Sequence, residues 1–185
     1  RRDGGNYEYT RSRIDSTGNV IRDCIDNLGF QRTINGSAVE VTDSLARLFS
    51  NSLNSVIYFA LLPYGLNDSA VNKRYIDSVK INGAPYHKIE VTFNEDGGGE
   101  DHEDIFLYWI HRTEFTTDYL AYTYHTDGGG MRFREAYNPR EVDGIRFVDY
   151  RNFKPALTDV DFSTIDSLYL AGDLKLLSTI ELEKV

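Results

Sequence analysis

Short segments of alternating polar and apolar residues fill the chain from residue 78 to residue 153, and Gly, Asn or Asp separates one segment from the next. Aromatic and β-branched residues are frequent in these segments, as is typical of antiparallel strands. Consecutive strands of this kind form a meander, in which each strand pairs with its neighbour along the chain. The same pattern precedes residue 42, where Asn35-Gly36 favours a two-residue hairpin turn. We therefore predict a mainly β (α+β) fold of antiparallel strands, with four strands before residue 42.

The segment of residues 43–60 departs from this strand pattern. Its apolar residues fall at helical spacing, and Thr42 or Asp43 can cap the first turn. Pro63 follows shortly after the last apolar residue, where it would end a helix. The sequence therefore predicts one main helix over residues 43–60. A shorter helix or turn is predicted over residues 67–77.

Two loops of the predicted meander share the core Asp-Gly-Gly-Gly: "NEDGGGEDHEDIF" at residues 94–106 and "HTDGGGMRFREAY" at residues 125–137. One further chain reversal separates them, so an antiparallel meander places both loops at the same end of the sheet. The loops are either solvated hairpin tips or the two halves of a shared cation site. Carboxylate oxygens suit Ca²⁺, and imidazole suits Zn²⁺. The candidate metal ligands are Asp96, Asp101, His102, Asp104, His125 and Asp127.

The composition fits a globular protein and argues against several classes of partner. The 185 residues are 41% hydrophobic and 13% aromatic, which predicts a single domain over residues 1–185 with its own core. The formal net charge of -9 argues against nucleic acid and against anionic membrane surfaces. Cys24 is the only cysteine, so no internal disulfide and no cysteine metal cluster can form. No apolar stretch reaches the length of a membrane-spanning helix.

The common enzyme motifs are absent from the sequence. It has no G-x-S-x-G elbow, no G-x-x-x-x-G-K-S/T phosphate loop and no strand-bounded G-x-G-x-x-G turn. Paired carboxylates for acid/base chemistry stay open, but nothing selects a pair among the 29 acidic residues, so no catalytic residue is predicted and the leading expectation is a protein without enzymatic activity. No cofactor is expected either, apart from a Ca²⁺ or Zn²⁺ ion at the glycine loops.

Large aromatic residues fall on both alternation phases of the predicted strands, so both faces of the sheet carry rings. Either helices cover the second face, or the sheet curls around an apolar cavity. Charged residues interrupt the same strands. Arg134 and Arg146 lie on neighbouring strands, and we expect them to pair with Glu90, Glu135 or Asp149.

Three segments resemble the strands of periplasmic lipoprotein carriers with the LolA/LppX-like fold: "VKINGAPYHKIEVTF", "IFLYWIHRTEFTTDYLAYTYH" and "YNPREVDGIRFVDYRNF". The resemblance implies a curved antiparallel sheet, a half-open barrel, wrapped around one main helix with an apolar cavity for acyl chains. Three further strings, "NSVIYFALLPYGLND", "GGGEDHED" and "GGGMRFREAYNPR", look like an uncharacterised family of exported envelope proteins of Gram-negative bacteria. This second resemblance implies a periplasmic or envelope-associated location. The absence of an initiator Met before Arg1 indicates that an N-terminal segment, such as a signal peptide, has been removed or left out.

The leading hypothesis is an exported, non-enzymatic protein that binds a hydrophobic or lipid-like ligand between the main helix and the curved sheet. Two alternatives stay open. One is a metal-dependent hydrolase or metal-stabilised module at the triple-glycine loops, and the other is a structural envelope protein without a ligand. The residues predicted to line the ligand site are Leu53, Val56, Tyr58, Phe59, Leu62, Tyr64, Trp109, Tyr122 and Phe133.

Overall fold

A computed structural model describes residues 2–3, 5–96, 102–125, 129–157 and 159–183. Within these residues the fold is mainly β, with two open antiparallel sheets and two α-helices. The chain divides into two compact units, residues 1–61 and residues 62–184. The predicted mainly β fold of antiparallel strands is therefore confirmed.

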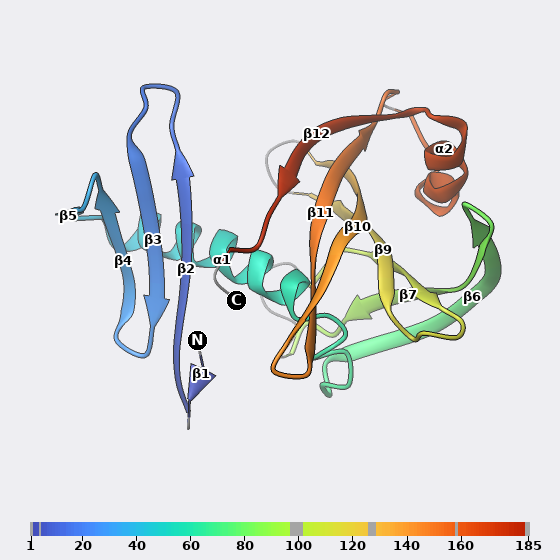
Figure 1. The fold of residues 1–185 in the computed structure, drawn as a ribbon, viewed down its shortest axis with the longest axis horizontal. Helices are drawn as coiled ribbons and strands as arrows, with labels where there is room; N and C mark the ends of the chain where they lie inside the picture. Colours follow the sequence, from blue (N-terminus) through green and yellow to red (C-terminus); the bar gives the residue numbers. More distant parts are fainter. Residues whose placement is uncertain (1, 4, 97–101, 126–128, 158, 184–185) are drawn as a thin grey trace. The chain divides into compact units, whose positions relative to one another are not determined.

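The first unit is a five-stranded sheet with one helix on it (Figure 1). Its strands are hydrogen-bonded in chain order, and α1 (Asp43–Ala60) packs against β2, β3 and β4. The predicted helix has these same bounds and is confirmed, as are the four predicted strands before residue 42. The strands are β1 (Arg2–Asp3), β2 (Asn6–Ile14), β3 (Val20–Asp26), β4 (Gly29–Ile34) and β5 (Ser37–Val39).

A charged network lies on the helix-facing side of this five-stranded sheet. Asp23 is 1% exposed, and the strand register places Arg11 and Arg32 directly opposite it on the two neighbouring strands. Both guanidinium groups donate to its carboxylate, at 2.9 Å from Arg11 and 2.6 Å from Arg32. The same two side chains reach α1: Arg32 lies 3.6 Å from the ring centroid of Phe49, and Arg11 donates to the Ser52 hydroxyl at 2.7 Å. Hydrogen bonds and a cation–π contact therefore attach this helix to its sheet.

The second unit is a seven-stranded antiparallel sheet, which is strongly curved (Figure 1). Neighbouring strands follow chain order throughout, so the predicted meander is confirmed. The strands are β6 (Val71–Ile81), β7 (Ala84–Phe93), β8 (Phe106–His111), β9 (Thr117–Tyr124), β10 (Gly130–Val142), β11 (Ile145–Pro155) and β12 (Leu174–Ile180).

Of the helix or turn predicted over residues 67–77, the turn is confirmed at residues 67–70. The prediction is wrong from Val71, where β6 begins and pairs with β7 as far as Ile81. Most side chains of β6 are exposed, since it is an edge strand. Its backbone pairing with β7 therefore outweighs a weak local helix signal.

Between β11 and β12 the chain forms the 3-10 helix η2 (Phe162–Thr164) and the short helix α2 (Ile165–Ala171). The sequence did not predict either element. The Asp161 side chain caps η2 by accepting from the Ser163 amide at 2.9 Å, and Gly172 ends α2 in the left-handed conformation. This segment packs on one face of the seven-stranded sheet, where it completes the main hydrophobic core of the unit.

Candidate functional site

The register of the seven-stranded sheet separates its side chains into two faces with different chemistry. Residues directly opposite each other on antiparallel strands point to the same face, so cross-strand partners can be followed from β7 to β10 as rows. On the face covered by α2, the two central rows contain Lys88, Trp109, Tyr119 and Glu135, and then Glu90, Leu107, Ala121 and Phe133. On the other face, the matching rows contain Ile89, Tyr108, Leu120 and Arg134, and then Val91, Phe106, Tyr122 and Arg132.

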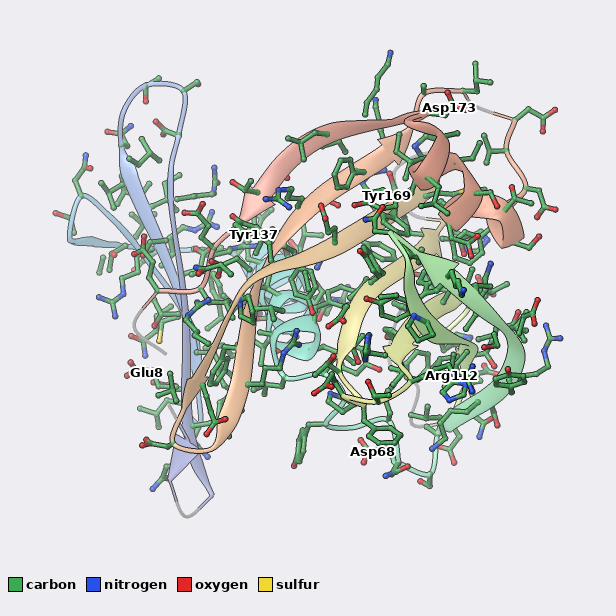
Figure 2. The ribbon with its side chains drawn as sticks, turned by 45° about the vertical axis from the view of Figure 1, so that its right-hand side comes forward. Glu8, Asp68, Arg112, Tyr137, Tyr169 and Asp173 are labelled. Carbon is green, nitrogen blue, oxygen red and sulfur yellow. The ribbon has the colours of Figure 1, made fainter. Side chains whose placement is uncertain are left out.

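The face under α2 is filled by protein side chains. Trp109 and Phe133 are both 0% exposed. Tyr169 of α2 (Figure 2) stacks its ring on Phe133, with centroids 4.6 Å apart. Burial raises the pKa of Tyr119 and of Tyr169, so these phenols stay protonated at neutral pH. The close packing of these rings makes this face a core.

A buried ion pair fixes α2 to this face. The Lys88 ammonium donates to the Asp166 carboxylate at 3.0 Å and to the Ser163 carbonyl at 2.6 Å. The Trp109 indole N–H donates to the same carboxylate at 3.1 Å. Lys88 and Asp166 are both buried, so their charges compensate each other out of contact with bulk water.

The opposite face combines an apolar floor on β7, β8 and β9 with arginines on β10. Its central residues, Tyr108 and Leu120, are 0% exposed. Towards the glycine-loop end, the face carries a connected set of side chains, most of which are partly exposed. We call this set the aromatic–arginine patch; it consists of Phe93, Phe106, Tyr122, Tyr124 and Arg132.

Each ring of the aromatic–arginine patch contacts the next ring along the patch. Phe106 contacts Phe93 edge-on at 5.5 Å and stacks on Tyr122 at 5.8 Å between centroids. Tyr122 lies 6.3 Å from Tyr124, and the guanidinium carbon of Arg132 lies 4.8 Å from the Tyr124 centroid. Beside the patch, Arg134 donates to the Tyr122 hydroxyl at 3.1 Å. The patch is therefore an aromatic surface that ends on a positive charge.

The last glycine of the second triple-glycine loop, Gly130, has a steric reason to be a glycine. A Cβ atom at Gly130 would lie 2.7 Å from the Tyr124 hydroxyl oxygen and 3.0 Å from the ring carbon that bears it. Gly130 also has a φ of +154°, which side chains rarely adopt. The glycine therefore makes room for the Tyr124 ring, which in turn supports Arg132.

One of the two arginines with predicted partners, Arg146, binds a different acid. Arg146 pairs with Asp118 at 2.9 Å, so the prediction that Arg146 pairs with Glu90, Glu135 or Asp149 is wrong. Each of those three acids instead binds another arginine, in the pairs Arg74–Glu90, Arg151–Glu135 and Arg140–Asp149. These ion pairs follow cross-strand and hairpin neighbours, which depend on a register that the sequence alone does not show.

The two glycine-loop flanks meet at one end of the sheet, as predicted. Asp104 precedes β8 and His125 follows β9, and the Asp104 Oδ1 atom lies 3.5 Å from the His125 Nδ1 atom. Of the other predicted ligands, Asp96 is exposed, His102 is half-buried, and Asp101 and Asp127 lie outside the described residues. Within the described part of the chain, no group of three or more His, Cys, Asp or Glu side chains is arranged to hold a metal ion. The cation site stays a prediction.

The structure distributes the predicted lining residues over several places. Trp109 and Phe133 belong to the core under α2, whereas Tyr122 lies on the opposite face, in the aromatic–arginine patch. Four of the others lie on α1 in the first unit, and the last two, Leu62 and Tyr64, precede β6 in the second unit. On α1, Leu53 and Phe59 are buried and Val56 and Tyr58 are half-buried; before β6, Leu62 is half-buried and Tyr64 is exposed.

Sequence reasoning missed Phe106 and Arg132, the residues opposite Tyr122 on the flanking strands. The alternation within each strand was visible, but the register that aligns Phe106, Tyr122 and Arg132 in one row depends on the lengths of the turns between strands.

Comparison with known proteins gives one match. A family model described as a family of unknown function (DUF6503) matches residues 9–184. No curated protein and no solved structure matches the chain. No helix among the described residues has both the length and the apolar character needed to cross a membrane. The resemblance to lipoprotein carriers stays a prediction.

Proposed function

The chain belongs to this family of unknown function (DUF6503), and we propose that it is a non-enzymatic carrier of a hydrophobic or lipid-like ligand. The ligand lies on the face of the seven-stranded sheet that carries the aromatic–arginine patch. The observation that carries the proposal is the connected set of partly exposed rings at the glycine-loop end of that face.

The contrast between the two faces supports this choice of surface. On the α2 side, Trp109, Phe133 and Tyr169 already fill the space above the sheet, so a ligand would have to displace core side chains. On the patch side, Phe93, Tyr122 and Tyr124 are each half-buried, and aromatic rings bury much apolar area with little loss of side-chain entropy. A hydrophobic ligand therefore gains more at the patch.

The proposal includes a half-open barrel formed by the seven-stranded sheet and a periplasmic or envelope-associated location. The curvature of the seven-stranded sheet agrees with a half-open barrel (Figure 1). Fractionation of the native host with an antibody against the chain tests the location: recovery in the envelope fraction supports it, and recovery in the cytoplasm contradicts it.

The experiment for ligand binding compares two Phe→Glu variants. Phe93→Glu places a carboxylate among the patch rings, whereas Phe115→Glu makes the same change at an exposed turn at the other end of the sheet. We expect the wild type and Phe115→Glu to bind a fluorescent fatty acid analogue equally, and Phe93→Glu to bind it at least about tenfold more weakly. Thermal melting checks that both variants fold.

Equal binding by all three folded proteins would place the ligand elsewhere and contradict the proposed surface. No binding by the wild type to fatty acid, alcohol or sterol probes would contradict the proposed function itself.

A further inference from the structure

The positive end of the aromatic–arginine patch identifies the chemistry of the ligand further. Resting on the function proposed above, we infer that the ligand is an anionic amphiphile whose acid group binds the Arg132 guanidinium while its apolar tail lies on the partly exposed rings of Tyr122 and Phe93. The shared chemistry of the acid group is that of a carboxylate or a phosphate monoester.

Arg132 differs from the ion-paired arginines of its sheet. Four others, Arg74, Arg140, Arg146 and Arg151, each bind a carboxylate at 2.9 to 3.0 Å. In the part of the chain that the structure describes, no carboxylate pairs with Arg132. Its Nη1 donates to the Met131 carbonyl at 2.9 Å, and its guanidinium carbon lies against Tyr124. A guanidinium has five N–H donors in a fork that matches a carboxylate or phosphate, and among the described residues the Met131 carbonyl is the one acceptor that Arg132 uses.

The position of Arg132 is preorganised for such a ligand. Gly130 admits the Tyr124 ring, and this ring supports the guanidinium from one side. A charge held in place by stacking loses less side-chain freedom on binding, which strengthens a charge-assisted hydrogen bond. Arg132 is half-buried, so its charge is partly shielded from water yet open to a ligand.

The geometry places the charge beside the apolar surface in one row. Arg132 lies directly opposite Tyr122, which lies directly opposite Phe106, so three consecutive strands carry a guanidinium, a half-buried ring and a buried ring that supports it. Adjacent strands are about 4.8 Å apart, so the row spans roughly 10 Å from the charge to the Phe106 ring. An extended chain of several methylene groups attached to an acid covers this length, whereas a free inorganic anion covers only its first part.

Selectivity also follows from the net charge of the chain. The formal charge is -9, so a small anion is repelled by the protein as a whole. An anion gains affinity only if an apolar tail adds the burial of methylene groups. The combination therefore favours acids with long tails over free phosphate or acetate.

The test is competition between a bound fluorescent fatty acid analogue and three unlabelled probes: dodecanoate, dodecanol and inorganic phosphate. The variants are Arg132→Gln and a matched control, Arg112→Gln. Arg112 is an exposed arginine that also lacks a carboxylate partner among the described residues and donates to Ser78 at 3.4 Å (Figure 2). Thermal melting verifies folding of both variants.

In the wild type and in Arg112→Gln, dodecanoate is expected to compete about tenfold more strongly than dodecanol. In Arg132→Gln, dodecanoate should fall to the level of dodecanol, while dodecanol itself is unchanged. Inorganic phosphate should not compete at comparable concentrations in any of the proteins. Dodecyl phosphate, added in a second series, distinguishes a phosphate monoester from a carboxylate as the preferred head group.

Three results would contradict the inference, and they differ in what they mean for the proposed function. Equal competition by dodecanoate and dodecanol in the wild type would leave the proposed function intact and remove the role of Arg132. Strong competition by inorganic phosphate would show a free-anion site that needs no tail. Failure of every probe to bind the wild type would contradict the proposed function and the inference with it.

Discussion

The two units attach a helix to a sheet by different means. In the first unit, α1 lies over a buried aspartate bound by two arginines, and those arginines reach the helix through Phe49 and Ser52. In the second, α2 lies over packed aromatic rings, and one ion pair, Lys88–Asp166, joins them at the edge of that core.

Different forces hold the two helices on their sheets. In the first unit, one buried carboxylate binds two guanidinium groups, which leaves one surplus positive charge on the network. The stability that this network contributes therefore depends on Asp23 staying ionised. The Lys88–Asp166 pair is balanced, and the Trp109 indole supplies a neutral third donor. The second unit should therefore depend most on apolar burial, and the first on its charges.

The largest expected effect comes from removing a ring from the core of the second unit. Phe133→Ala should lower its free energy of unfolding by about 4 kcal/mol, because a fully buried phenyl ring is replaced by a cavity. Urea unfolding followed by the fluorescence of Trp109, the only tryptophan, reports on this unit. The control Leu176→Ala, at a position 56% exposed on β12, should change the value by no more than about 0.5 kcal/mol. A comparable loss in both variants would contradict an aromatic core as the main support of this unit.

The buried ion pair under α2 should come next. Lys88→Met leaves the Asp166 carboxylate buried without its cation and should cost roughly 3 kcal/mol in the same fluorescence assay. The double variant Lys88→Met/Asp166→Leu removes both charges and should recover most of that loss. If the double variant is as unstable as the single one, the pair is not the reason for the loss.

The charged network of the first unit should respond to neutralisation of its centre. Asp23→Asn keeps an acceptor for Arg11 and Arg32 but removes the negative charge, and should cost about 2 kcal/mol. Amide hydrogen exchange of β3 measures the loss within this unit. Thr10→Ala, on the outer face of β2, is the control and should leave the exchange rates unchanged. Unchanged exchange in Asp23→Asn would show that α1 does not depend on these charges.

The smallest expected effect is a pH dependence of the same network. Burial of Asp23 opposes its ionisation, but the hydrogen bonds and charges of Arg32 and Arg11 outweigh burial and lower the pKa of its carboxyl. A lowered folded-state pKa gives stability that is complete above the pKa of the unfolded state, about 4, and is lost as the pH falls through the pKa of the folded state. The difference in β3 exchange between wild type and Asp23→Asn should therefore shrink as the pH is lowered from about 6 towards about 2. A difference that grows in acid would reverse the assigned sign.

The elements with strong local periodicity could be predicted from the sequence. Residues 43–60 show helical spacing over 18 residues, and the structure has a helix with those bounds. Elements held by distant contacts could not be predicted. β6 is an exposed edge strand stabilised by pairing with β7, and α2 is only seven residues long, too short for a clear periodic signal.

The candidate site was only partly visible in the sequence for the same reason. Tyr122 and Trp109 both look like inward-facing strand residues, because each strand alternates correctly by itself. The turn at residues 112–116 and a register shift after Trp109 decide that they lie on opposite faces. Register is therefore the information that the sequence lacked, and it is also what brings Arg132 beside Tyr122.

The most direct test of ligand carriage is native mass spectrometry of freshly purified protein, compared with the same sample after denaturation. We expect an additional mass of a few hundred daltons that is lost on denaturation, and an extract that contains an amphiphile with an acid group. The same protein carrying Phe93→Glu should show the bare polypeptide mass. A bare mass for the wild type, unchanged after incubation with dodecanoate, would contradict the carrier function.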